Sequence, residues 1–252
     1  MGLADRRIAI LQSNYIPWRG YFDIINLCDI FVFLDDVQYT RRDWRNRNKI
    51  RTSSGPRWLT VPVLTKGAYH QMVQDTRISD PSWAASHWRS IELSYRRAPH
   101  FKAYEARYRS LYERAAGLSH LSAINRLFIQ AIMVDLRIST ELLDSAALAV
   151  DATKSNRILE ICRRLGATRY LSGPSAAAYL DLDAFAAAGI AVEWMRYDTQ
   201  ISYSQVHGPP YTANVSALDM LFNVGEDARD LLVGADCHFT PDHASGTPGT
   251  SQ

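Results

Sequence analysis

The sequence predicts an α/β protein with a doubly wound, mostly parallel sheet, similar to a Rossmann fold and interrupted by a helical insertion. Short apolar runs typical of buried strands occupy residues 7–11 and 30–34, and a segment with helical spacing, 21–28, lies between them. A strand, a helix and a second strand in this order form a βαβ unit, which implies parallel strands joined by a right-handed crossover. The same alternation returns after residue 141.

The composition is that of a globular protein, because hydrophobic residues make up 47% and charged residues 21% of the 252-residue chain. No apolar run reaches the roughly 18 residues that a membrane span requires, and the run at 8–11 is too short for a signal peptide. We therefore expect a cytoplasmic protein without a membrane span. The net charge of +2 argues against a wholly basic nucleic-acid-binding domain but leaves room for a local anion site.

The middle of the chain predicts one further strand and then a helical section. Residues 58–63 alternate in polarity and contain Pro62, which places this strand at an edge of the sheet. From residue 83, aromatic and apolar side chains recur about every four residues until Pro99 interrupts the pattern, and helical spacing then continues to residue 136.

The remaining sequence completes a single domain. The expected elements are a strand at 141–145, a helix at 153–165, a strand at 169–171, a helix at 182–188, a strand at 190–195 and a helix from residue 216. Ser216 is expected to cap that last helix, with Asp219 as the acid of a capping box. We assign residues 1–236 to one α/β domain with a helical section at about 82–136, and residues 237–252, which lack apolar periodicity, to a disordered tail.

Cysteine and glycine motifs identify no cofactor. The three cysteines, Cys28, Cys162 and Cys237, are an odd number without paired spacing, so they predict neither a disulfide framework nor a zinc site. Walker A, Gly-x-Gly-x-x-Gly and Gly-x-Ser-x-Gly motifs are absent from the sequence. We therefore assign no metal ligands, and the cofactor stays unknown.

The first candidate binding segment is the loop after the first strand, at residues 12–23. In an open α/β sheet, ligands bind beyond the carboxyl ends of the strands, where loops lead into helix N-termini. The residues assigned to ligand binding there are Gln12, Asn14, Tyr15, Trp18 and Gly20. Free backbone N–H groups at the start of the following helix would hold a phosphate or a carboxylate. The alternative is a loop whose aromatic residues pack against the protein itself.

The second candidate segment, residues 34–49, begins with two carboxylates and continues into a basic and aromatic stretch. Asp35 and Asp36 end the second strand, a common position for catalytic carboxylates or a magnesium site. The residues assigned to substrate binding are Gln38, Tyr39, Arg42, Asp43, Trp44, Arg45, Asn46, Arg47, Asn48 and Lys49. Guanidinium and amide groups suit polyanionic or sugar-bearing ligands, and single-stranded nucleic acid would use the same residue types. A solvated charged surface is the alternative.

Two further places complete the set of candidates. Ser172 and Gly173 follow a predicted strand and suit a close approach of a ligand to the backbone, although a simple tight turn would use the same residues. His87 is a candidate general base, because histidine exchanges protons near neutral pH. It shares a helix face with Trp83 and Ile91, so a buried, hydrogen-bonded histidine is the alternative.

Several of these blocks resemble the WbqC-like protein family. The matching segments are 12–23 (QSNYIPWRGYFD), 31–49 (FVFLDDVQYTRRDWRNRNK), 58–63 (WLTVPV), 163–181 (RRLGATRYLSGPSAAAYLD) and 218–225 (LDMLFNVG). Ser13 stands where the family pattern has proline. The resemblance implies a modifying enzyme of O-antigen, other surface-glycan or natural-product biosynthesis, which attaches an acyl or aminoacyl group to an amino sugar or a related amine. It does not specify the activated acyl donor, for which an aminoacyl-tRNA is one candidate.

A second similarity concerns the loop after the first strand alone. Residues 17–21 (PWRGY) are similar to the Pro-x-His-x-Gly-His loop of nucleotidylyltransferases, pantothenate synthetase and class I tRNA synthetases, which share a doubly wound fold. Both histidines that those enzymes use on ATP phosphates are missing here, which argues against ATP chemistry, and shared fold is weak support for shared function.

The sequence thus supports one main hypothesis and two alternatives. The main hypothesis is a transferase or ligase that binds phosphates with the cations of residues 41–49. In this hypothesis Asp35 or Asp36 is the general base, and His87 is the alternative base. The alternatives are a non-catalytic RNA- or tRNA-binding module and an ATP-using enzyme similar to nucleotidylyltransferases. The main hypothesis requires that the two earliest crossover loops, which contain Tyr15 and Arg47, border one pocket.

Overall fold

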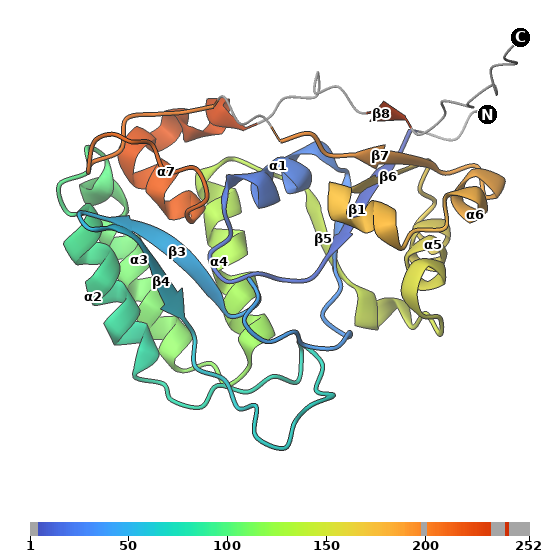
Figure 1. The fold of residues 1–252 in the computed structure, drawn as a ribbon, viewed down its shortest axis with the longest axis horizontal. Helices are drawn as coiled ribbons and strands as arrows, with labels where there is room; N and C mark the ends of the chain where they lie inside the picture. Colours follow the sequence, from blue (N-terminus) through green and yellow to red (C-terminus); the bar gives the residue numbers. More distant parts are fainter. Residues whose placement is uncertain (1–4, 198–200, 233–239, 242–252) are drawn as a thin grey trace, which may run out of the picture.

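The computed structural model describes residues 5–197, 201–232 and 240–241, and it confirms a mostly parallel sheet flanked by helices (Figure 1). The strands lie in the order β5 (Glu141–Asp144), β2 (Ile30–Phe33), β1 (Arg7–Leu11), β6 (Arg169–Ser172), β7 (Ala191–Trp194) and β8 (Thr240–Pro241). Neighbouring strands are parallel, except that β7 and β8 are antiparallel. The predicted tail at 237–252 lies outside the described residues, apart from the two residues of β8.

Helices cover both faces of the sheet, as a doubly wound fold requires. The helices are α1 (Arg19–Leu27), α2 (Trp83–Tyr95), α3 (Phe101–Ala116), α4 (Leu121–Asp135), α5 (Lys154–Arg164), α6 (Leu182–Ala187) and α7 (Ala217–Val224), with 3-10 helices η1 (Ser145–Leu148), η2 (Pro174–Ala178) and η3 (Gly225–Leu231). The sheet face with Ile8 and Val32 packs against α5 and α6, and the face with Ala9 and Phe31 packs against α1, α4 and α7. Because both faces are buried, these strands are continuous apolar runs.

The strand order reverses beside β1. The chain runs from β1 to β2 and β5 on one side and then crosses to β6 and β7 on the other. The loops that follow β1 and β6 therefore diverge at the carboxyl edge of the sheet, and open α/β sheets bind their ligands at such a point.

The predicted helical section forms α2, α3 and α4, and it packs against the sheet rather than standing apart from it. Ile91 of α2, Leu111 of α3 and Phe128 of α4 belong to the same buried cluster as Phe31 of the sheet. Pro99, which interrupts the helical pattern in the sequence, lies in the turn between α2 and α3.

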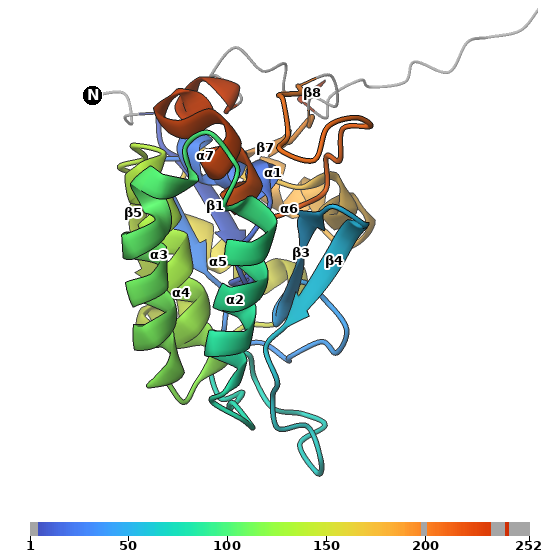
Figure 2. The same cartoon turned by 90° about the vertical axis from the view of Figure 1, so that its left-hand side faces the viewer.

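The strand predicted at 58–63 is β4 (Gly55–Thr60), and its placement at an edge of the main sheet is wrong. β4 pairs antiparallel with β3 (Arg47–Thr52) in a separate two-stranded ribbon, which lies alongside α2 (Figure 2). Pro62 lies beyond the end of β4, so it does not mark a sheet edge. The sequence did not predict β3, because its inward positions hold Asn48 and Ile50 while its other positions carry cations that read as a charged loop.

The last helix begins where the sequence predicts, but without the predicted capping box. Ser216 Oγ accepts a hydrogen bond from Leu218 N at 3.3 Å, so Ser216 is the N-cap of α7. The Asp219 carboxylate is buried and accepts from Tyr95 Oη at 2.9 Å, whereas Ser216 N donates to Lys49 O at 2.8 Å. The core contacts of Asp219 therefore replace the reciprocal bond of a capping box.

The two cysteines that the structure describes lie away from the candidate sites. Cys28 and Cys162 are buried, and burial raises the pKa of both thiols, which makes them poor nucleophiles. Cys237 lies outside the described residues.

The helices were also compared with the length and apolarity of a membrane span. Within residues 5–197, 201–232 and 240–241, none of them meets both requirements.

Candidate active site

The loops that follow β1 and β2 lie side by side at the carboxyl edge of the sheet. Tyr15 N donates to Trp44 O at 3.1 Å. Asn125 of α4 fastens both loops, because its Nδ2 donates to Ser13 Oγ at 3.1 Å and to Arg45 O at 2.9 Å. The two crossover loops therefore meet, but neither Tyr15 nor Arg47 lines the cavity described next, so the common pocket that the main hypothesis requires between them is not found there.

A cavity of about 550 Å³ opens between the ends of β2 and β5. Its volume falls in the range of roughly 300–1,000 Å³ that is usual for small-molecule sites. Asp35 and Asp36, both assigned to the site from the sequence, line it. The polar lining residues that the sequence analysis missed are Gln74, His120, Ser122, Arg126, Asp144 and Ser145.

Asp35 is fastened on all sides by the protein. Its side chain is 1% exposed, Oδ1 accepts from Ser13 N at 2.8 Å, and Oδ2 accepts from Ser122 Oγ at 2.5 Å. Arg126 Nη2 lies 3.4 Å from Oδ2 and completes an ion pair. Both carboxylate oxygens are engaged by the protein, so the structure favours an anchor between α4 and the first loop over the general-base role predicted for Asp35.

Asp36 is held in a similar way but is less deeply buried. Oδ1 accepts from Ser145 Oγ at 2.5 Å, and Oδ2 pairs with Arg157 of α5. Its side chain is 12% exposed. Asp36 can therefore accept a hydrogen bond from a ligand in the cavity, while its ion pair with Arg157 disfavours the predicted role of general base.

The cavity has an excess of negative charge. Arg126 pairs with both Asp35 and Asp144 and stacks on the Phe33 ring with its guanidinium carbon 5.0 Å from the ring centroid. Asp144 remains 41% exposed, so its carboxylate is available to a ligand. In the part of the chain that the structure describes, no three His, Cys, Asp or Glu side chains are arranged to hold a metal ion.

His120 is the histidine that the cavity adds to the candidate residues. It is the N-cap residue of α4 and is half-buried on the cavity wall. Its Nδ1 forms a hydrogen bond of 2.9 Å with Ser119 Oγ, which leaves Nε2 for a ligand. Nothing in the local sequence distinguishes His120 from a surface histidine, because it reaches the cavity only through the packing of α4 on the sheet.

Tyr15 and His87, both assigned to the site from the sequence, lie in the hydrophobic core and do not line the cavity. The Tyr15 hydroxyl forms hydrogen bonds with His87 Nδ1 at 2.9 Å and with Tyr112 Oη at 2.8 Å. Tyr15 also packs edge-on against Trp83 and Phe128. Burial lowers the pKa of His87 to about 4, so the imidazole stays neutral at physiological pH. Both assignments are therefore corrected, and His87 is a buried, hydrogen-bonded histidine.

The anion site predicted at the start of α1 is covered by Trp18. The Trp18 ring lies against Gly20 so closely that a Cβ added there would be 2.3 Å from a ring carbon. The ring also contacts Tyr197, with 4.9 Å between the centroids. Glycine is required at this position because the tryptophan ring occupies the space of a side chain.

Replacing Gly20 with alanine is expected to destabilise the protein by about 2 kcal/mol, because the Trp18 ring must move out of its packed position. Urea unfolding measures the loss. Gly117→Ala is the matched control, since Gly117 has a φ of −83° and the nearest atom to its added Cβ is 3.5 Å away. Equal losses in the two variants would show that the Trp18 contact does not limit this position.

The remaining residues of the first and third candidate segments lie where the strand order reverses, and they do not line the cavity. Gln12 and Asn14 follow β1, and Gly173 follows Ser172, which ends β6. Arg45 Nη1 donates to Asn14 Oδ1, which brings a cation to this point. Burial lowers the pKa of Arg45, and its buried Nε has no hydrogen-bond partner within the described ranges.

The basic and aromatic stretch separates into inward and outward residues. Tyr39 is buried, Asn46 Nδ2 donates to Val61 O at 2.8 Å, and Asn48 Nδ2 donates to Ile16 O at 2.9 Å. These three side chains support the loops, so their assignment to substrate binding is corrected. The exposed or partly exposed members are Gln38, Arg42, Asp43, Trp44, Arg45, Arg47 and Lys49.

The missed residues come together through strand pairing and helix packing. Ser122 and Arg126 are four residues apart on α4 and so share one helix face. Asp144 ends β5 beside Phe33, which ends β2. The sequence predicted the helical periodicity of α4. It could not predict which strand ends this face of the helix packs against.

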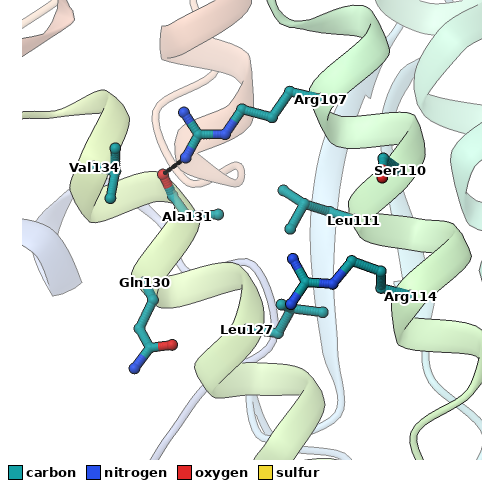
Figure 3. Close-up of a pocket in the computed structure, with 8 residues that line it drawn as sticks. All are labelled: Arg107, Ser110, Leu111, Arg114, Leu127, Gln130, Ala131 and Val134. Carbon is teal, nitrogen blue, oxygen red and sulfur yellow. Dashed lines mark hydrogen bonds between the residues drawn. The ribbon is translucent and has the colours of Figure 1, made fainter.

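A second hollow, of about 350 Å³, lies between α3 and α4 (Figure 3). Arg107 on its rim is already engaged, because Nη2 donates to Ala131 O at 3.1 Å and Nη1 pairs with Asp135. Leu111 and Leu127 contribute apolar surface to it. This hollow lies in the helical layer, so we place the candidate active site at the cavity between β2 and β5.

Comparison with known proteins gives one family and one curated relative. The sequence model described as the WbqC-like protein family matches residues 12–231. The relative is "Uncharacterized protein Rv1507c" of Mycobacterium tuberculosis (strain ATCC 25618 / H37Rv), which is 44% identical over 227 residues, or 90% of this chain and 97% of that protein. No solved structure matches the chain.

Proposed function

The chain belongs to the WbqC-like protein family, and from this membership together with the cavity we propose that it is an enzyme that attaches an acyl or aminoacyl group to the amine of an amino sugar or a related polar small molecule. The cavity between β2 and β5 would hold the acceptor amine. Surface-glycan or natural-product biosynthesis is the setting that we propose for this reaction.

The charge of the cavity is the observation that carries the proposal. Three carboxylates, Asp35, Asp36 and Asp144, line it together with the guanidinium of Arg126. An ammonium group and sugar hydroxyls donate the hydrogen bonds that carboxylate and serine oxygens accept, and a cationic amine gains from the excess negative charge. A polyanionic acceptor would be repelled by the same residues.

We propose His120 as the general base. The bound ammonium first releases one proton to solvent, and the neutral acceptor nitrogen then attacks the carbonyl carbon of an activated ester or thioester, so that a C–N bond forms. The bond from that carbon to the oxygen or sulfur of the donor breaks, and its electron pair leaves with the oxygen or sulfur. His120 takes the proton that the nitrogen loses and can return it to the leaving atom.

Arg45 suits the donor side of the reaction. It lies at the switch point beside Asn14, and its buried Nε is a hydrogen-bond donor without a partner in the described residues. The Arg45 side chain is 18% exposed, and its guanidinium would hold a phosphate or carboxylate of the donor. Coenzyme A thioesters and aminoacyl-tRNA both carry such phosphates, so the geometry at Arg45 does not choose between them.

Glucosamine tests the acceptor site, with glucose and N-acetylglucosamine as uncharged comparisons. Glucosamine is expected to raise the melting temperature more than either, because ligand binding stabilises the native state. Asp144→Asn is expected to weaken glucosamine binding about tenfold. Glu141→Gln, the same charge change at the other end of β5, is the matched control. Equal shifts with all three sugars, or equal losses in both variants, would place the acceptor elsewhere and overturn the proposal.

His120→Gln tests the reaction itself. With glucosamine and a panel of acyl-coenzyme A thioesters and aminoacyl-tRNAs, mass spectrometry is expected to show at least about 100-fold less acylated product, because general-base catalysis is worth that much. The thermal shift with glucosamine should persist. His70→Gln, at an exposed histidine, should leave product formation unchanged. Product formation that is intact in His120→Gln, or no acylated glucosamine with any of these donors, would contradict the mechanism.

A further inference from the structure

The outward face of the β3–β4 ribbon carries cations around an exposed tryptophan. The strand register sets Lys49 opposite Trp58 and Arg47 opposite Thr60, so both cations share the face of Trp58. Lys49 Nζ lies 4.8 Å from the Trp58 ring centroid, and the guanidinium carbon of Arg47 lies 4.3 Å from it. The ribbon therefore presents an aromatic platform bordered by positive charge.

A second tryptophan and a tyrosine extend this surface. The Trp44 and Trp58 rings are 5.3 Å apart between centroids, and they are 39% and 40% exposed. Tyr69, which is 70% exposed, lies under the guanidinium of Arg41 at 5.0 Å. The paired tryptophan rings therefore offer a stacking surface to a partner, and Tyr69 adds an exposed ring on the same stretch of sequence.

The positive charge of this segment is offset only in part by its own acid, since Asp43 pairs with Arg45 at 3.6 Å. Residues 41–66 contain eight Lys or Arg residues and one acid, Asp43, whereas the whole chain has a net charge of only +2. Asp43 is occupied, because it accepts from Thr40 Oγ1 at 2.7 Å and from Trp44 N at 2.7 Å. The ribbon is therefore a local cationic surface on a nearly neutral protein.

A hollow of about 600 Å³ adjoins the platform. Trp58 forms one wall, Arg57 supplies a further cation, and His207 lies at its border with a buried Nε2 that has no partner within the described ranges. The hydroxyl groups that line it belong to Thr52, Ser53, Ser54, Ser90 and Ser94. A ring wall, a cation and a row of hydroxyls suit a nucleoside with its phosphate.

We infer that the outward face of the β3–β4 ribbon binds single-stranded RNA, with bases stacked on Trp58 and Trp44 and phosphates held by the surrounding Arg and Lys side chains. The spread of cations from Arg41 to Lys66 favours several phosphates in a row over a single nucleotide. Exposed aromatic rings set among the cations favour RNA over an acidic peptide, which has no bases to stack. This site does not rest on the proposed transfer reaction.

Fluorescence anisotropy with a labelled mixed-sequence RNA strand of about ten nucleotides tests the inference. For about three neutralised phosphates, log affinity is expected to fall with log salt with a slope of about −2. Trp58→Ala should weaken binding about tenfold, and Trp58→Phe should retain most of it, since stacking on one ring is worth that much. The Phe variant keeps the test informative should the Ala variant fold poorly.

The double variant R47Q/K49Q should weaken RNA binding about tenfold and flatten the salt slope by about one. R163Q/R164Q on α5 makes the same charge change on the opposite face of the sheet and should bind RNA like the unmodified protein. Three results would overturn the inference. They are a salt slope near zero, an equal loss of RNA affinity in the two double variants, and competition by AMP or polyglutamate as strong as competition by unlabelled RNA. None of these measurements involves an acyl donor, so failure of the transfer reaction would leave their result intact.

Discussion

Replacing Asp35 with alanine is expected to lower the free energy of unfolding by about 4 kcal/mol, because it breaks a buried ion pair and leaves buried donors unsatisfied. The carboxylate is 1% exposed and joins Ser13 N, Ser122 Oγ and Arg126. Its loss would leave Asn125 as the remaining hydrogen-bonding link described between α4 and the loop that follows β1. Urea unfolding followed by circular dichroism measures the effect.

Two variants show whether burial causes this loss. Asp35→Asn keeps an oxygen for Ser13 N, so it should cost less than half as much as alanine. Asp144→Ala removes the other carboxylate that pairs with Arg126, but the Asp144 side chain is 41% exposed, and exposed pairs contribute only about 0–1 kcal/mol. A loss in Asp144→Ala as large as that in Asp35→Ala would contradict the anchoring role of Asp35.

A comparable loss, about 4 kcal/mol, is expected for Asp219→Ala, which removes a buried acceptor shared by three donors. Tyr95 Oη donates to Oδ2 at 2.9 Å, and Tyr203 Oη and Gln205 Nε2 donate to Oδ1 at 2.8 and 2.9 Å. These bonds connect α7 with α2 and with the segment before α7. Asp227→Ala, at an exposed carboxylate, should change the unfolding free energy by less than about 0.5 kcal/mol.

Asp219 also makes stability depend on pH. Burial raises the pKa of this carboxyl in the folded protein above its ordinary value of 3.8, so the folded state takes up a proton at a higher pH than the unfolded state does. The unfolding free energy contributed by Asp219 therefore rises as the pH falls from above the folded pKa toward 3.8. Compared with Asp219→Asn, the unmodified protein should gain stability in urea unfolding as the pH is lowered from neutrality toward 3.8. Parallel pH profiles would show that the carboxyl is not shifted.

The sequence predicted strands best where every side chain of the strand is buried, and worst where buried and exposed side chains alternate. The runs at 7–11 and 30–34 became β1 and β2 because parallel strands covered on both faces contain apolar residues throughout. β3 was missed because one of its faces carries Arg47 and Lys49. In the sequence, cations at alternate positions look like a solvated run of charges rather than a strand. Its partner β4 was predicted as a strand, but nothing local to it specified a separate ribbon.

The candidate site shows the same division. Asp35 and Asp36 were found from their position at the end of a strand, whereas Tyr15 and His87 were misassigned because an aromatic loop residue and a helical histidine look alike in the sequence whether they face solvent or core. His120 gave no local signal at all. Its place in the site depends on the packing of α4 against the end of β2.

By itself the sequence determined the alternation of strands and helices, the crossover unit at its start, and the two acids that follow the second strand. Only the tertiary structure decided that Arg126 and Asp144 join those acids, that Tyr39, Asn46 and Asn48 turn inward, and that Trp58 remains in water. Local periodicity fixes which side chains share a face of an element, because that depends on backbone geometry alone. Which face meets which neighbour depends on contacts between residues far apart in the chain, and those contacts set the burial and charge on which a binding site depends.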